Sequence, residues 1–591
     1  MNGCRDDRTT VIRQATFPIA VAALTAVCFV PALSGSFLNW DDDVNFLSNT
    51  AYRGLGPEQV RWAFTSVLYG HYIPLTRLTF SFNYVLGGMD PRGYHVFNVL
   101  LHAVNAALFY VVVRRLLAAA NDGGRQRRRG DWDLSSSAAA AALAFGVHPV
   151  RVEPVAWITA RADLLCATFV LLTTWAYLRA VDGAGSARRG LILVATAAFT
   201  AALLSKGVAL SIPAALLLLD VYPLHRFSRV GWWSLVREKM PLFAVSVAAS
   251  VIVVYAVRHG TPLTPSGRYD VGARMAIAAY SFIVPIARFV WPFALSPLTE
   301  MPARVTLFDA RFGLAVVGAV LVTIALIAVW RRWPAPLTAW TFSVLVLAPV
   351  SAAVKVSTDL VPDRHSYLAG LGFAALIGGV ALAVSQLVRR GVLARPVAWL
   401  VAVAAGTVIV GLGATSWSYS AIWSHPESLW RWAIEVDPDC ARCHANLAEV
   451  LLESPGRESR AAEAANLLRR AITLRPDLRE ANFNLGAALM TQGRYAEAEA
   501  PLRRSMEPPP APVIVYERLG RLYLLERRYE DAIPMLRNAV RSAPHVVQVR
   551  GHLLEALRGR ARELQVKGRG AEAEPFLSES HALERDIVGR P

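Results

Sequence analysis

The sequence is poor in charged residues, and the shortage lies in its first two-thirds, before about position 420. Asp, Glu, Lys and Arg make up only 18% of the chain, whereas hydrophobic residues make up 54%. A soluble globular protein usually carries about a quarter charged residues. Since 591 residues are also too many for one core, we expect a cytoplasmic tail over residues 1–16, an apolar membrane domain over 17–418 and a soluble domain over 424–585.

The sequence also lacks the signatures of several protein classes. It contains no Walker motif, dinucleotide-binding fingerprint or His-Glu-x-x-His zinc motif. Its five cysteines form no disulfide framework. The net charge of +17 comes largely from short Arg clusters between apolar stretches, which is typical of the cytoplasmic loops of a membrane protein. We therefore expect no nucleic-acid partner.

Long apolar stretches fill the first domain. A membrane-spanning helix needs about 20 such residues, and the sequence offers about eleven candidates, near 17–35, 96–117, 134–147, 162–180, 190–204, 208–222, 241–257, 312–330, 336–353, 367–386 and 396–416. The first follows an Arg-bearing leader without a convincing small-residue cleavage site, which favours an uncleaved helix over a signal peptide. The sequence predicts an all-α, multi-pass membrane bundle.

The basic loops indicate its orientation. They fall on alternating sides if the apolar stretch 272–294 is a re-entrant or interfacial helix and not a twelfth span. The loops then predicted to be cytoplasmic contain Arg5, Arg8, Arg13, Arg125, Arg127, Arg128, Arg129, Arg188, Arg189, Arg226, Arg229, Arg237, Lys239, Arg331, Arg332, Arg389, Arg390 and Arg395. This topology predicts an inner-membrane protein whose C-terminal domain lies in the periplasm.

The C-terminal domain contains an internal repeat. Leu485-Gly486 recurs as Leu519-Gly520, and Pro476, Pro510 and Pro544 are set at the same spacing. This spacing is the period of the tetratricopeptide repeat (TPR), about 34 residues, in which paired helices stack into an α-solenoid. An earlier unit that ends at Pro476 carries a short insertion. Such a stack presents a concave face, so we expect it to bind a protein or peptide partner.

The segment Cys440-Ala-Arg-Cys443-His444 has the form of a c-type haem attachment motif. It also coincides with the start of the first helix of a repeat, where no haem cavity is expected. We therefore favour an ordinary repeat helix, with a local disulfide as an option, over haem.

Three adjacent carboxylates, Asp41, Asp42 and Asp43, follow the first apolar segment. Adjacent carboxylates near lipid are costly and repel one another. They can bind a divalent cation such as Mg²⁺ or Mn²⁺, with Asp42 as the candidate ligand, or one of them can accept a proton as a general base. The other interpretation is a solvated loop with helix-capping acids.

Further polar residues stand at span ends on the same predicted side. Arg161 and Asp163 enter an apolar span, so they face the protein interior or a cavity, either for function or for structural pairing. Lys206 ends another span, where it can also snorkel to the interface. The remaining candidates are His148, Glu153, Lys355, Asp359, Asp363, Arg364, His365 and Tyr367. Cations beside carboxylates suit a reaction with an anionic leaving group such as phosphate.

The order of these motifs resembles the transmembrane and tetratricopeptide-repeat O-mannosyltransferase family, within the glycosyltransferase C superfold. The matching segments are Trp40-Asp-Asp-Asp43, Ile73-Pro-Leu-Thr-Arg-Leu-Thr-Phe80, Tyr94-His-Val-Phe-Asn-Val-Leu-Leu-His102, His148-Pro-Val-Arg-Val-Glu153, Arg161-Ala-Asp163 and Asp363-Arg-His-Ser-Tyr-Leu368. The family's acid pair falls on Asp41 and Asp42, or on Asp42 and Asp43. Where relatives often have Lys followed by Glu, this chain has Lys206-Gly207.

This resemblance implies an integral membrane glycosyltransferase that moves a sugar from a polyprenyl-phosphate carrier to an extracytoplasmic acceptor such as a protein Ser or Thr. Catalysis is expected from the acid trio. Substrate or phosphate binding is expected from His148, Glu153, Arg161, Asp163, Lys206, Arg364 and Tyr367. The alternative from a different class is a non-catalytic, membrane-anchored TPR scaffold for protein–protein interaction.

Overall fold

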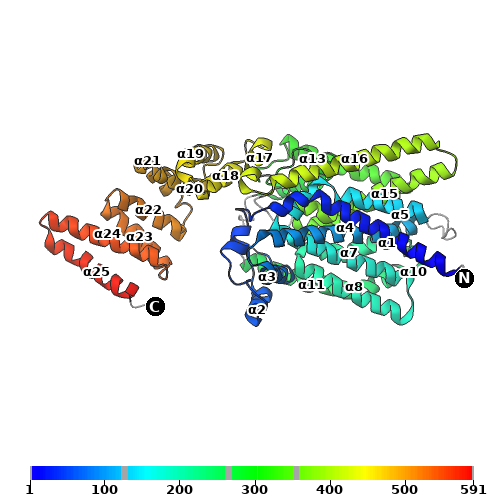
Figure 1. The fold of residues 1–591 in the computed structure, drawn as a ribbon, viewed down its shortest axis with the longest axis horizontal. Helices are drawn as coiled ribbons and strands as arrows, with labels where there is room; N and C mark the ends of the chain where they lie inside the picture. The colour runs from blue at the N-terminus through cyan, green and yellow to red at the C-terminus, as the bar shows by residue number, and fades with distance from the viewer. Residues whose placement is uncertain are drawn as a thin grey trace. The chain divides into compact units, whose positions relative to one another are not determined.

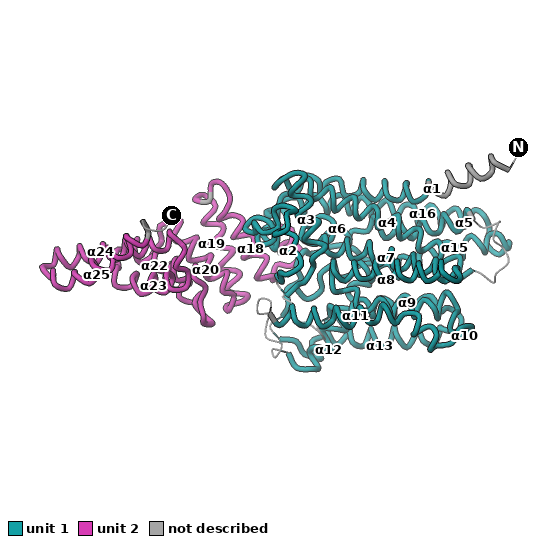
Figure 2. The backbone as a smooth tube through the Cα atoms, turned by 90° about the horizontal axis from the view of Figure 1, so that it is seen from below, with its two compact units in different colours: residues 1–429 teal, residues 430–591 magenta. Residues whose placement is uncertain are grey.

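The computed structural model describes residues 3–68, 70–121, 131–259, 269–302, 304–351 and 359–588. Over these residues the fold is all-helical, as predicted, apart from two isolated β-bridges. The chain divides into two compact units, residues 1–429 and 430–591, shown in two colours in Figure 2. Arg125, Arg127, Arg128, Arg129 and Lys355 lie outside the described residues.

The first unit is a bundle of long helices (Figure 1). Its α-helices are α1 Gly3–Cys28, α2 Pro57–Thr65, α3 Pro74–Gly87, α4 Pro91–Asn121, α5 Asp131–Gly146, α6 Val152–Ala156, α7 Arg161–Asp182, α8 Gly185–Ser205, α9 Ile212–Val221, α10 Phe227–Val230, α11 Trp232–His259, α12 Val271–Val290, α13 Ala310–Val329, α14 Pro334–Leu347, α15 Ser366–Arg389 and α16 Arg395–Ile422. α17, Pro426–Val436, crosses the boundary between the units.

Eight helical segments among the described residues are long and apolar enough to cross a membrane. They are Pro91–Asn121, Ile158–Asp182, Gly185–Ser205, Trp232–Arg258, Val271–Val290, Ala310–Val329, Asp363–Arg389 and Arg395–Ile422. Shorter apolar helices run over Thr16–Cys28, Gly207–Val221 and Pro334–Val350. The chain is therefore a multi-pass membrane protein. The span count of eleven and its sidedness stay predictions, because Val271–Val290 is long enough to span.

Large apolar side chains cover the outside of this unit. On α13, Leu314 is 71% exposed, and on α16 Val410 is 72% exposed. In water such a surface would be a large unpartnered apolar patch, whereas in a bilayer it faces lipid tails of the same polarity. The exposed faces of α13 and α16 therefore fit a membrane environment.

The polar candidates lie where helices begin and end. The 3-10 helix η1 (Val30–Ser34) follows α1 and leads into a loop that carries Asp41 and Asp42, and Asp43 begins one turn of π-helix, η2 (Asp43–Leu47). Pro149 begins the short 3-10 helix η3 (Pro149–Arg151), which α6 continues. Extended backbone at Lys206 separates α8 from the 3-10 helix η5 (Gly207–Ser211). The 3-10 helix η8 (Asp363–His365) leads directly into α15.

The second unit is a stack of helix pairs. It contains α18 Ala441–Glu453, α19 Arg457–Leu474, α20 Arg479–Thr491, α21 Tyr495–Arg504, α22 Val513–Leu525, α23 Tyr529–Ser542, α24 Val547–Val566 and α25 Gly570–Val588. The first residues of α20 and α22 are separated by one repeat period. α18 begins slightly earlier than that period requires, as the insertion before Pro476 predicts.

The repeated glycines mark where paired helices cross. A Cβ atom on Gly486 would collide with Leu502, and a Cβ atom on Gly520 would collide with Leu536. Both glycines lie in the middle of a helix, where Gly costs stability relative to Ala unless close approach needs it. The glycines recur at the repeat period because each helix pair has the same close contact at that position.

Candidate functional site

The structure gives the three acids of the trio three different environments. Asp42 is fully buried. Its carboxylate accepts hydrogen bonds from the backbone N–H of Leu38 at 3.0 Å and of Thr159 at 3.2 Å, and from the Thr159 hydroxyl at 2.6 Å. Burial raises the pKa of Asp42 to about 7, although these hydrogen bonds oppose the rise. Asp42 therefore ties the loop after α1 to the turn that precedes α7.

Asp41 and Asp43 are less enclosed. Asp41 is half-buried, and its carboxylate interacts electrostatically with the guanidinium of Arg364. Burial raises the pKa of Asp41, and the positive charge of Arg364 lowers it. Asp43 is exposed, and its carboxylate accepts a hydrogen bond from the neighbouring Val44 N–H. Of the three acids, Asp41 is the one on which the charge of Arg364 acts.

Arg364 lies at the centre of the site. Its guanidinium pairs with Glu153 and lies 3.6 Å from the Asp359 carboxylate, and its backbone N–H donates to Glu153 at 3.0 Å. The guanidinium also lies over the Trp157 ring, 5.1 Å from its centroid, and Trp157 stacks on Trp40. Arg364 thereby connects η8, α6 and the loop that carries the acids.

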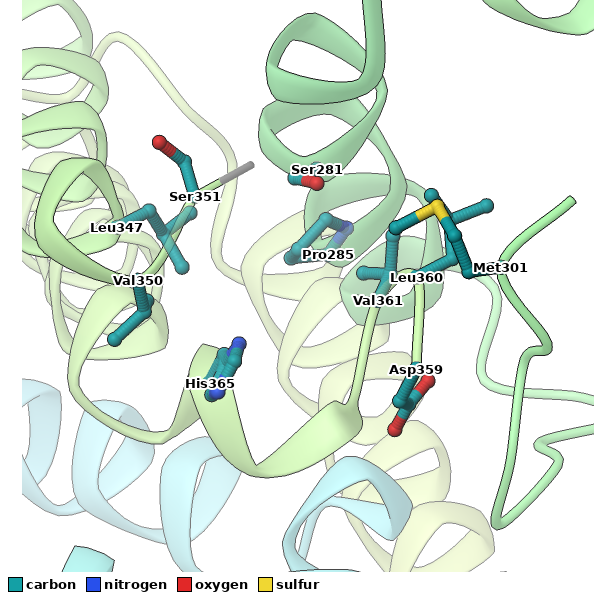
Figure 3. A pocket seen from close by; sticks show the side chains of 10 residues that line it. All are labelled: Ser281, Pro285, Met301, Leu347, Val350, Ser351, Asp359, Leu360, Val361 and His365. Carbon is teal, nitrogen blue, oxygen red and sulfur yellow. The ribbon is translucent and has the colours of Figure 1, made fainter. Parts of the chain in front are cut away.

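Asp359, beside Arg364, also lines a small cavity. Burial raises the pKa of its carboxyl group to about 6, although Arg364 opposes the rise. Figure 3 shows Asp359 and His365 with the apolar residues around this cavity. The lining residues are Ser281, Pro285, Met301, Leu347, Val350, Ser351, Asp359, Leu360, Val361 and His365.

Asp163 and Lys206 form an ion pair near Arg364. The Lys206 ammonium lies 2.5 Å from the Asp163 carboxylate, and both side chains are largely buried. Asp163 also interacts electrostatically with Arg364. The extended backbone at Lys206 ends α8, so the lysine side chain reaches the first turn of α7. Two cations from distant parts of the sequence thus lie in one polar region.

Arg161 is saturated by protein acceptors. Its guanidinium donates to Asn98 Oδ1 at 2.8 Å, to Asn83 Oδ1, and to the Tyr94 carbonyl at 3.0 Å. The side chain is fully buried, and no carboxylate pairs with it among the described residues. This arrangement gives Arg161 a role in joining α3, α4 and α7, and leaves its predicted contact with phosphate untested.

His148 and Tyr367 are likewise bound within the protein. The His148 Nε2–H donates to the Phe289 carbonyl at 2.9 Å, and Nδ1 accepts from the Val150 N–H. The buried Tyr367 hydroxyl lies 2.6 Å from the Nδ1 atom of His102. His148 joins the start of η3 to the end of α12, and Tyr367 joins the start of α15 to the middle of α4. Their predicted role in substrate binding stays a prediction.

Arg288 and Thr159 are site residues that the sequence analysis did not single out. Arg288, near the end of α12, pairs with Asp363 at 2.6 Å, and Thr159 binds Asp42. The signal for Arg288 was available, since an arginine within an apolar stretch is the same signal that identified Arg161. Thr159 carried no signal, because a threonine beside an apolar span is common.

The described residues can be compared with the two cofactors that the sequence raised, the expected divalent cation and the disfavoured haem. They contain no group of three or more His, Cys, Asp or Glu side chains that could hold a metal ion, and both oxygens of Asp42 accept hydrogen bonds from the protein. Cys440 and Cys443 form a disulfide at the start of α18, and the His444 ring binds the Pro438 carbonyl at 3.0 Å. The disulfide leaves neither cysteine a thiol for a thioether bond to haem, and the divalent cation stays a prediction.

Comparison with known proteins supports both the predicted repeats and the predicted resemblance to O-mannosyltransferases. The tetratricopeptide-repeat family model matches residues 513–545. Protein O-mannosyl-transferase TMTC1 of Homo sapiens is 26% identical over 537 residues, which cover 79% of this chain and 57% of that protein. Protein O-mannosyl-transferase TMTC4 of Homo sapiens is 33% identical over 172 residues, or 27% of this chain and 23% of that protein.

The predicted resemblance is thus confirmed, and the alignments cover about half or less of these relatives' own length. A similar solved structure is that of ArnT from Cupriavidus metallidurans bound to undecaprenyl phosphate. The alignment covers 83% of this chain and 80% of the ArnT chain. It shows 17% sequence identity and a TM-score of 0.37.

Proposed function

We propose that this relative of the protein O-mannosyl-transferases is a membrane glycosyltransferase, which moves a sugar from a polyprenyl-phosphate carrier to a hydroxyl of an extracytoplasmic acceptor. The observation that carries the proposal is the half-buried Asp41 carboxylate next to Trp40, whose ring centroid lies 6.0 Å from the Arg364 guanidinium, and on which the charge of Arg364 acts. A base and a cation in one polar region are what a displacement with a phosphate leaving group requires.

Asp41 acts as the general base in this mechanism. Its carboxylate takes the proton of the acceptor hydroxyl, and the oxygen attacks the anomeric carbon. The bond from that carbon to the phosphate oxygen breaks, and the lipid phosphate leaves with the electron pair. Attack opposite the leaving group inverts the anomeric configuration.

Arg364 and Lys206 offset the negative charge that develops on the departing phosphate. Each already has a carboxylate partner, Glu153 for Arg364 and Asp163 for Lys206. These carboxylates hold the cations in place before substrate arrives, so less reorganisation is needed in the transition state. Asp42 holds the loop that carries Asp41, through its bonds to Leu38 and Thr159.

The second unit supplies partner binding and no chemistry in this proposal. Its stacked helix pairs match the TPR architecture, which presents a concave surface to peptides. We propose that this unit binds the acceptor protein or an assembly partner on the periplasmic side. Under the scaffold alternative, this binding would be the protein's whole function.

The test is transfer by the purified full chain in lipid nanodiscs. The substrates are radiolabelled polyprenyl-phosphate hexoses, the acceptors are Ser/Thr-rich peptides, and nucleotide hexoses serve as the donor control. We expect label to reach the acceptor from the lipid-linked donor alone. Transfer from nucleotide sugars instead would refute the proposed donor, and protein-partner capture with no transfer from any donor would favour the scaffold.

A further inference from the structure

Arg288 contacts several parts of the segment that carries Arg364. Its guanidinium donates to the Asp363 carboxylate at 2.6 Å, to the Val361 carbonyl at 2.7 Å and to the Thr299 hydroxyl at 2.9 Å. The arginine comes from the last turn of α12, and its side chain is largely buried. The N–H donors of a planar guanidinium point in fixed directions, whereas those of a lysine ammonium rotate, so an arginine holds its acceptors in one geometry.

The same region is fixed by backbone contacts. The Thr299 N–H donates to the Asp359 carboxylate at 3.3 Å, and the Leu360 N–H donates to the Thr299 carbonyl at 2.8 Å. Asp359 is the acid that lies 3.6 Å from Arg364. Arg288 therefore binds both of the segments that these backbone contacts join, one at Thr299 and the other at Val361. Asp359, in the second segment, reaches Arg364.

The last turn of α12 also contacts His148, at the start of the segment that carries Glu153. The carbonyl of Phe289 accepts the Nε2–H of His148 at 2.9 Å, and the two rings stack with centroids 4.7 Å apart. His148 begins the segment that carries Glu153, the main partner of Arg364. Adjacent residues of α12 thus contact the two segments that form the Arg364–Glu153 pair.

We propose that Arg288 is a positioning residue that sets the place of Arg364 relative to Asp41. Two of its three bonds go to Val361 and Asp363, and the third goes to Thr299, which itself binds Asp359 and Leu360, so Arg288 acts through the 359–365 segment. The effect on the transfer rate rests on the proposed function, whereas the effect on the segment itself does not. Arg288 has two parts in this role. Its charge neutralises the buried Asp363 carboxylate, and its hydrogen bonds fix the Val361 carbonyl and the Thr299 hydroxyl.

Two variants separate these parts. Arg288→Met removes all three bonds and leaves the Asp363 carboxylate buried without this partner. Arg288→Met/Asp363→Asn removes the charge imbalance but does not restore the bonds to Val361 and Thr299. The matched control is Arg311→Met, which removes an arginine from an exposed ion pair with Asp309 at the start of α13.

The first measurement is amide hydrogen exchange of the full chain in nanodiscs. In both Arg288 variants we expect exchange over residues 359–366 to become at least about tenfold faster, with peptides from the second unit and the Arg311→Met control unchanged. Wild-type exchange rates over 359–366 in the double variant would overturn the proposal, because Arg288 would then only neutralise Asp363.

The second measurement is the transfer assay. We expect kcat to fall by about 10²-fold in both variants at nearly unchanged KM for the acceptor, since a misplacement near 1 Å can cost that much. Full recovery of kcat in the double variant would also overturn the proposal. Failure of the proposed function is distinguishable, because wild-type protein would then transfer no sugar while the exchange experiment still reports on Arg288.

Discussion

At the scale of single residues, the acid trio shows how three identical side chains acquire different properties. Asp42 accepts hydrogen bonds from buried protein donors, Asp41 is half-buried and feels the charge of Arg364, and Asp43 is exposed. Sequence alone assigned the trio to the site but left the register of the acid pair open. The distinction depends on Thr159 and Arg364, which are far from the trio along the chain, so no local pattern could provide it.

The raised pKa of Asp42 predicts a pH-dependent stability. Its pKa is about 7 in the folded protein and near 3.8 when unfolded, so the folded state holds this proton more tightly. Stability is therefore greatest below the unfolded pKa and falls as pH rises through about 7. At about 1.4 kcal/mol per pKa unit, the total loss is up to about 4 kcal/mol.

Thermal unfolding of the full chain and of Asp42→Asn in detergent, followed by tryptophan fluorescence between pH 4 and 8, checks this. The melting temperature of the wild type should fall relative to that of the variant as pH rises. A difference that stays constant across this range would show that Asp42 ionises normally.

At the scale of helices, a second cluster of buried charges joins the other ends of α7, α9 and α11. Asp220 accepts from the Tyr177 hydroxyl at 2.6 Å and pairs with Lys239 and, at 3.0 Å, with Arg226. Asp220 and Lys239 are fully buried. Since α7 also carries Asp163, the partner of Lys206, α7 and the 206–221 segment share two polar links, one near each end.

Asp220→Asn should therefore destabilise the first unit by about 3–5 kcal/mol, because it leaves Lys239 and Arg226 buried with one carboxylate fewer. The matched control is Asp182→Asn, which removes the exposed partner of Arg115 and should leave stability unchanged. Thermal unfolding of both variants in the same detergent decides it. Equal melting temperatures would mean that the cluster contributes nothing to stability.

The repeat glycines allow a sharp test in the second unit. Gly520→Ala places a methyl group against Leu536, whereas Gly551→Ala, within α24, meets nothing within 4 Å. The first change should destabilise the unit, and the second should stabilise it by about 0.5–1 kcal/mol, as Ala is the better helix former. Urea unfolding of a fragment from Ser424, followed by circular dichroism, measures both. Stabilisation by both changes would show that the glycines do not mark close helix contacts.

At the scale of the whole molecule, the sequence predicted the membrane bundle and the repeat stack because each rests on a periodic or compositional signal. Leu485-Gly486 and Leu519-Gly520 share one register, and the helices that carry them begin one repeat period apart. The polar contacts were less predictable. Arg161 and Lys206 were both candidates for binding phosphate, yet Arg161 has amide and carbonyl partners and Lys206 has a carboxylate. The apolar neighbours of an ionisable residue in the sequence predict that its side chain is buried. They do not predict which residue it pairs with.

Sidedness is a further whole-molecule prediction. An odd number of spans with a cytoplasmic N-terminus places the second unit in the periplasm. Alkaline phosphatase fused after Pro591 should be active and green fluorescent protein at the same position dark, since the latter does not fold when exported unfolded. The reverse pattern would place the second unit on the cytoplasmic side and remove the basis for an extracytoplasmic acceptor.

The central claim is that Asp41 is the base of a sugar transfer from a lipid phosphate, with Arg364 offsetting the charge of that phosphate. The measurement is the initial rate of transfer by Asp41→Asn beside Asp43→Asn, its matched control two positions away, at equal amounts of folded protein in nanodiscs. Loss of the base should lower kcat by about 10²–10⁴-fold, whereas Asp43→Asn, an exposed acid, should retain nearly the wild-type rate. Equal rates for Asp41→Asn and the wild type would contradict the account.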